Sequence, residues 1–164
     1  MNRPGIQPAV CPGMVYSNCS MAHPELDQLL DSVLTFAQQM LKVHGEFYPF
    51  GESLDVTGKR AMDGAHTGSE HPPSQELIDL LVQAYAHRAR SGELRAAAVC
   101  ADVRVVPPGK VGKTDAISVG LEHQSGEAVN VFLPYQKGWF GRIRYGELFA
   151  SARDPQFFLK SGSA

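Results

Sequence analysis

The sequence predicts an α+β fold in which two amphipathic helices pack on one face of a mainly antiparallel sheet of about five strands. Two segments repeat apolar residues every three or four positions, and the period changes to two near residue 96. The connections between the later strands are short, which favours antiparallel pairing in chain order. The expected order is therefore helix, two strands, helix and three or more strands.

The first helix is expected to begin at Pro24, because proline suits the first helical position and Glu25 suits the positive end of the helix dipole. Gly45 supplies its left-handed cap. The apolar stripe of this helix consists of Leu26, Leu29, Leu30, Val33, Leu34, Ala37, Met40 and Leu41. The second helix is expected from the N-cap residue Ser74 to a stop near Gly92. Its apolar stripe consists of Leu77, Ile78, Leu80, Leu81, Ala84 and Tyr85.

Two strands are expected between the helices. Residues 46–54 are aromatic and extended, and Pro49 indicates an edge position or a bulge because proline has no N–H for a central ladder. Turn residues around Gly58 then predict a hairpin, with residues 60–65 as its second arm.

Further strands are expected after the second helix. Residues 96–106 alternate between two faces, and so do residues 115–122 and 129–133, which are joined by a loop that contains Gly126. Residues 138–145 are expected to form one more strand. The three C-terminal strands therefore read as a meander.

The composition is that of an ordinary globular protein. Of the 164 residues, 43% are hydrophobic and 20% are charged, and the formal net charge is −2. No general positive field would attract nucleic acid or anionic lipid, and no run of apolar residues is long enough to span a membrane. We expect one domain over residues 23–159, a flexible leader over residues 1–22 and a frayed tail over residues 160–164.

The sequence offers no convincing metal or cofactor motif, and none is expected. Cys11 and Cys19 are too far apart for a zinc knuckle, and three scattered cysteines fit a reducing cytoplasm. His66 and His71 lack the spacing of a zinc helix. Residues 109–114 end in Gly-Lys-Thr but have too few residues between the glycines for a phosphate-binding loop.

A group of polar residues on the later strands gives one candidate site. Asp102 and Glu122 point outward from neighbouring strands, and His123 follows directly. Solvated charges across the sheet would explain the same pattern. The functional alternative is a small-molecule-binding protein or modest hydrolase, with a pocket lined by Phe47, Tyr48, Phe50, Asp102, Glu122 and His123.

Aromatic residues near the end of the meander give the other candidate site. Tyr135, Trp139 and Phe140 lie in or beside an expected connection that also contains Arg142. Aromatic and arginine side chains are enriched in interface hot spots. These four residues predict a partner-binding surface, and packing of a lid loop is the alternative.

The run Gly-Glu-Phe-Tyr-Pro-Phe-Gly at residues 45–51, with Asp-Ala-Ile at 115–117 and Leu-Glu-His at 121–123, resembles small uncharacterised bacterial proteins. In its order of elements the chain also resembles profilin-like and roadblock-like folds. Roadblock-like domains are generally non-enzymatic scaffolds that often dimerise. The complete sheet, the aromatic connection and the lack of a catalytic constellation lead us to expect a non-enzymatic interaction module of the scaffold or toxin-neutralising type, with another protein or a second copy as partner.

Overall fold

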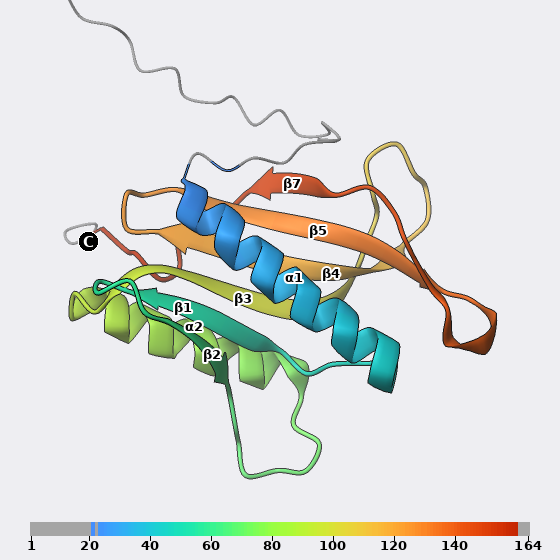
Figure 1. Cartoon of the computed structure of the whole chain (residues 1–164), viewed down its shortest axis with the longest axis horizontal. Coiled ribbons are helices and arrows are strands. Elements are labelled where there is room, and N and C mark those ends of the chain that lie inside the picture. Colours follow the sequence, from blue (N-terminus) through green and yellow to red (C-terminus); the bar gives the residue numbers. More distant parts are fainter. Residues whose placement is uncertain (1–20, 22, 161–164) are drawn as a thin grey trace, which may run out of the picture.

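The computed structural model describes residue 21 and residues 23–160. Apart from Met21 and Lys160, the expected leader and tail lie outside the described residues. In chain order, the elements are α1 (Pro24–His44), β1 (Phe50–Asp55), β2 (Arg60–Gly64), α2 (Ser74–Arg90), β3 (Leu94–Val105), β4 (Thr114–His123), β5 (Ala128–Lys137), the short 3-10 helix η1 (Trp139–Gly141), β6 (Ile143–Tyr145) and β7 (Phe149–Ala152) (Figure 1).

One antiparallel sheet contains all the described strands. Its order is β2-β1-β3-β4-β5-β6, and β7 also pairs with β5. The α+β class and the antiparallel sheet are confirmed, with seven strands instead of about five. β6, of three residues, lies within the strand expected over residues 138–145, and the first part of that stretch forms η1 instead. β7 has four residues and is not expected from the sequence, because so short a segment cannot show a convincing alternation of apolar and polar residues.

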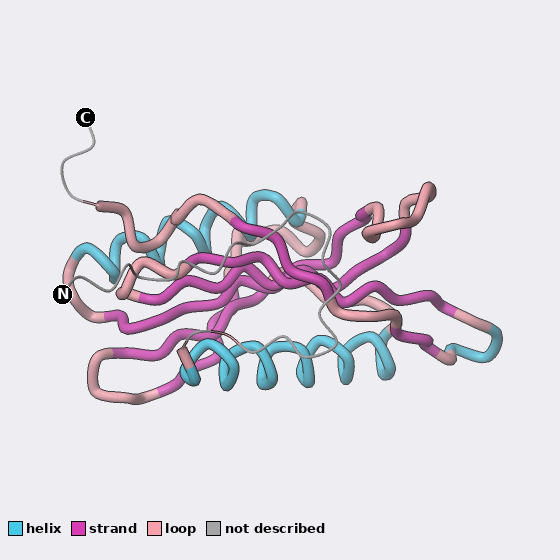
Figure 2. Tube along the Cα trace, turned by 90° about the horizontal axis from the view of Figure 1, so that it is seen from above, coloured by secondary structure: helices cyan, strands magenta, loops and turns pink. Residues whose placement is uncertain are grey.

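The two helices lie on opposite faces of the sheet, so the expectation that both pack on one face is wrong (Figure 2). The central strand β3 decides this arrangement. Its Ala96, Ala98 and Cys100 belong to the core under α1, whereas Ala97 and Val99 belong to the core under α2. A strand buried on both faces has apolar residues at every position, and the run of alanine and valine in β3 has that pattern.

Helix α1 forms the larger core. All the stripe residues predicted for it are buried except Met40, and they pack on β1, β3, β4 and β5. The helix begins with a proline and ends at Gly45, whose φ of 75° is in the left-handed region. Both ends of α1 are therefore where the sequence predicts them.

Helix α2 covers only part of the second face, over β1 and β3. The chain after β7 returns to this same face, and Phe157 packs there against Tyr85 with ring centroids 5.5 Å apart. A smaller core of α2, β3 and the C-terminal segment results. This return is not foreseen from the sequence, because it depends on a contact between residues far apart in the chain.

Candidate functional site

A cleft of about 840 Å³ lies at the end of the sheet where the connection between β3 and β4 faces β6. Its walls come from residues 107, 108, 110–114, 134–136, 144–147 and 149. Beside it, the β5–β6 hairpin projects from the body of the molecule (Figure 1). Three segments that are well separated in the sequence thus form one candidate interaction surface.

The β5–β6 hairpin presents two aromatic side chains to solvent. Its strands pair from Tyr135–Tyr145 to Lys137–Ile143, and the Gly138 N–H donates a 2.7 Å hydrogen bond to the Arg142 carbonyl. Trp139 is 88% exposed and Phe140 is 100% exposed at the tip. The turn is fixed at its base, so the two rings are held away from the core.

Phe140 also has an unusual backbone conformation. Its φ is 60°, and it is the only non-glycine residue with a positive φ in the described part of the chain. This region costs an L-residue roughly 1–2 kcal/mol, and bulky side chains rarely adopt it. Phe140 and Gly141, whose φ is 71°, are the two central residues of the turn, and a tight hairpin turn of this kind requires a positive φ at both.

Positive charge is concentrated at this end of the sheet. Residues 102–115 and 135–147 contain six cations and three carboxylates, whereas the rest of the chain has nine cations and fourteen carboxylates. The six cations are Arg104, Lys110, Lys113, Lys137, Arg142 and Arg144. Arg104 is 3.6 Å from Asp115 and forms an ion pair. The candidate surface is therefore basic although the whole chain is slightly acidic.

Of the four residues predicted for a partner surface, three lie on the exposed hairpin: Trp139, Phe140 and Arg142. Tyr135 does not, because it is only 2% exposed and packs in the α1 core. Its hydroxyl donates a 2.8 Å hydrogen bond to Asp102. The pKa of Tyr135 is raised, mainly by burial and secondly by this hydrogen bond to the Asp102 carboxylate. Tyr135 therefore anchors the base of the hairpin, beside the cleft.

The residues predicted for the alternative pocket are not brought together. Phe47 and Phe50 pack edge-to-face under α1, and the hydroxyl of the exposed Tyr48 is 3.3 Å from His71 Nδ1. Glu122 faces the C-terminal segment on the α2 side of the sheet.

Asp102 and His123 share the other face but lie far apart along it. Asp102 is opposite Ile117 of β4, and His123 is the last residue of that strand. At about 3.3 Å per residue, their positions differ by roughly 20 Å. Asp102, Glu122 and His123 therefore do not form a joint acid–base site.

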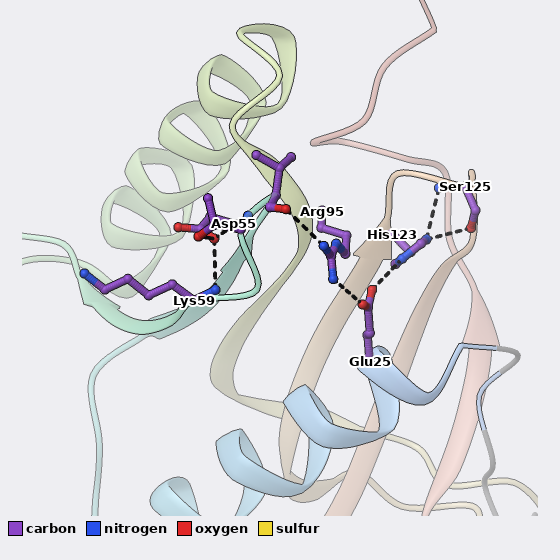
Figure 3. Close-up of polar contacts among 8 residues, drawn as sticks. Glu25, Asp55, Lys59, Arg95, His123 and Ser125 are labelled. Atoms are coloured by element: carbon purple, nitrogen blue, oxygen red, sulfur yellow. Dashed lines mark hydrogen bonds and ion pairs between the residues drawn. The ribbon is translucent and has the colours of Figure 1, made fainter.

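His123 instead takes part in a network that joins the start of α1 to the β4–β5 hairpin (Figure 3). Its Nε2 lies 2.9 Å from Glu25 Oε2, and Arg95 donates a 2.7 Å hydrogen bond to Glu25 Oε1. The Ser125 N–H donates to His123 Nδ1 at 3.1 Å, which makes Nδ1 an acceptor. The Ser125 hydroxyl lies 2.8 Å from the same nitrogen, and Nε2 is left to donate its hydrogen to the Glu25 carboxylate.

The sequence does not predict this network, because Glu25 is 70 positions from Arg95 and 98 positions from His123. Glu25 appears in the sequence only as an acidic residue near a helix start. The ring of His23 stacks on His123 at 3.9 Å and adds a further contact to the network. Both nitrogens of His123 are occupied, so the network is suited to holding α1 against the hairpin.

No protein-family model matches the chain. No curated protein or solved structure matches it either. Among the described residues, no cluster of three His, Cys, Asp or Glu side chains could hold a metal ion. No described helix is long and apolar enough to cross a membrane.

Replacing Glu25 with Gln should lower the free energy of unfolding by about 1–2 kcal/mol near neutral pH. Burial opposes ionisation of Glu25, but its hydrogen bonds to Arg95 and His123 outweigh burial and hold its pKa below 4.5. A lowered carboxyl pKa stabilises the fold above the unfolded-state value, and this contribution is lost as pH falls through the folded-state value.

Urea unfolding of the wild type and Glu25→Gln from neutral pH to below pH 4.5 would measure this difference. The difference in the free energy of unfolding between the two proteins should narrow below the ordinary carboxyl pKa. Glu46→Gln, at an exposed position, is the matched control. A gap that stays constant into strong acid would contradict a stabilising role of the Glu25 carboxylate.

Proposed function

We propose that the protein is a non-enzymatic interaction module that binds another protein through the tip of the β5–β6 hairpin. The observation that carries the proposal is the exposure of Trp139 and Phe140, at 88% and 100%. Two adjacent large aromatic residues outside the core gain nothing from folding, but both can be buried by a partner. Self-association through the same tip is the other outcome that the proposed surface allows.

The free energy that burial of these side chains would contribute to binding supports this proposal. Full burial of a large apolar side chain contributes about 1.5–3 kcal/mol. Tryptophan is also among the residues most enriched in hot spots, which cost about 2 kcal/mol or more when truncated. The hairpin is tied at its base by the hydrogen bond from Gly138 to Arg142. A pre-ordered tip loses less conformational entropy on binding than a flexible loop does.

Replacing Trp139 with Ala should weaken partner binding by roughly thirty-fold, which corresponds to a hot-spot loss of about 2 kcal/mol. Because the side chain is almost fully exposed, the free energy of unfolding should change by less than about 0.5 kcal/mol. Pull-down with quantitative titration of the captured protein measures the first quantity, and urea unfolding measures the second. Sedimentation of the wild type and the variant tests self-association.

Tyr48→Ala is the matched control, because Tyr48 is an exposed aromatic residue outside the hairpin. It should leave partner binding and molecular mass unchanged. If Trp139→Ala leaves both the captured partner and the sedimenting mass as they are in the wild type, the hairpin tip is not the binding surface. Trp139 is the chain's only tryptophan, so its fluorescence also reports contacts at the tip.

A further inference from the structure

We infer that the cleft beside the hairpin binds an acidic segment of the partner protein. This inference rests on the proposed function, because it assigns the chemistry of the partner that the hairpin tip engages. The cleft volume of about 840 Å³ is suited to several side chains of an extended segment. It is much larger than a single inorganic anion needs.

The charges around the cleft indicate the sign of the ligand. Lys110 and Lys113 reach it from the β3–β4 connection, and Arg144 reaches it from β6. Glu147 is the only carboxylate among the residues that line it. None of the three cations forms an ion pair with a carboxylate of the described residues. An arriving carboxylate would therefore find positive groups that are not already neutralised.

The cleft is not purely basic, and this favours a polypeptide over a simple polyanion. Tyr145, Phe149 and Pro134 contribute apolar surface to the same lining. Acidic residues interspersed with apolar ones match both kinds of surface, and the cleft is lined by the base of the hairpin that carries Trp139 and Phe140 at its tip. A long nucleic acid would also meet the rest of the molecule, which carries the excess of carboxylates.

A direct test uses a synthetic peptide of about ten residues, rich in glutamate with one central phenylalanine, labelled for fluorescence anisotropy. The wild-type chain should bind it, and binding should weaken as salt is raised from about 50 to 300 mM because exposed charges are screened. The triple variant Lys110→Gln, Lys113→Gln, Arg144→Gln should lose roughly ten-fold or more in affinity, since each exposed pair contributes up to about 1 kcal/mol.

The matched control is Lys42→Gln, Lys59→Gln, Arg90→Gln, which removes three exposed cations from other parts of the surface. It lowers the net charge equally and should keep the peptide affinity. Circular dichroism checks the fold of both triple variants. If the cleft variant does not fold, Lys110→Gln alone is used, and it should weaken the peptide about two- to five-fold.

No binding of the peptide to the wild type, or equal loss in the two triple variants, would overturn the acidic-segment inference. Tighter binding of a single-stranded oligonucleotide at the same salt concentration would assign the cleft to nucleic acid instead. Displacement of the peptide by millimolar inorganic phosphate would overturn the inference and show that the cleft is a simple anion site. Each result leaves the Trp139→Ala pull-down unaffected, so failure of the cleft is distinguishable from failure of the hairpin tip.

Discussion

Glu122→Gln is expected to release the C-terminal segment from the sheet and to lower the free energy of unfolding by about 3–5 kcal/mol. The Glu122 carboxylate is 0% exposed and accepts hydrogen bonds from the backbone N–H groups of Gln156, Phe157 and Phe158. Its Oε2 also lies 2.9 Å from the Arg153 guanidinium. One buried carboxylate therefore holds much of the returning chain.

The isosteric amide tests this role because it preserves the shape of the side chain and removes its charge. An amide also places an N–H₂ group where one acceptor oxygen faces backbone donors, which leaves hydrogen bonds unmade. Phe157 is 1% exposed and would lose its packing on Tyr85 as the segment leaves. Loss of the carboxylate and loss of the aromatic contact thus act together.

Thermal unfolding and limited trypsin digestion at Arg153 would measure the release. Asp154→Asn, an exposed carboxylate in the same segment, is the matched control and should behave like the wild type. Release of the segment in Glu122→Gln should increase cleavage at Arg153. Phe157→Ala should increase this cleavage too, without changing any charge. Wild-type cleavage rate and melting temperature in Glu122→Gln would show that the carboxylate does not hold the segment.

Arg60→Ala is expected to lower the free energy of unfolding by about 3 kcal/mol, the low end of the range for breaking a buried ion pair. The Glu52 side chain lies under α1 and is 5% exposed, whereas Arg60 is 36% exposed. The Glu52 Oε1 atom lies 2.8 Å from the guanidinium, while its Oε2 has no hydrogen-bond partner among the described residues. Without Arg60, the buried carboxylate would have no cation beside it.

A double-mutant cycle separates the buried charge from the other contacts of Arg60, which also donates to the Gln28 carbonyl of α1 at 3.2 Å. Glu52→Gln in the Arg60→Ala background should recover more than half of the lost stability, because a neutral amide is less costly to bury than a charge. Lys59→Ala, at the adjacent exposed position, is the control. Equal stability of the single and double variants would show that charge burial is not the cause of the defect.

The candidate interaction surface was predictable only in part. The aromatic residues after β5 were identified from their composition, and Trp139 and Phe140 are exposed as expected. Tyr135 differs from them and is buried, because β5 continues through Lys137 and its alternation places Tyr135 beside Val131 and Leu133 under α1. The exact end of a strand decides which face a residue occupies, and composition does not define that end.

The basic cleft and the Glu25–His123 network could not be predicted. Lys110 and Arg144 come from segments that are joined only when β4 and β5 form a ladder. Glu25 and His123 meet only when α1 lies across the sheet. Neither set has a short-range spacing that could be recognised in the chain.

The two helices, the period of the strands and the β4–β5 hairpin can be derived from the amino-acid pattern, because they follow from repeats of 3.6 and 2 and from local turn residues. The placement of the helices on opposite faces and the attachment of the C-terminal segment to Glu122 depend on the three-dimensional packing. A local pattern shows that a residue is to be buried but does not specify its partner. That partner is set by the burial of both faces of β3 and by contacts between residues far apart in the chain.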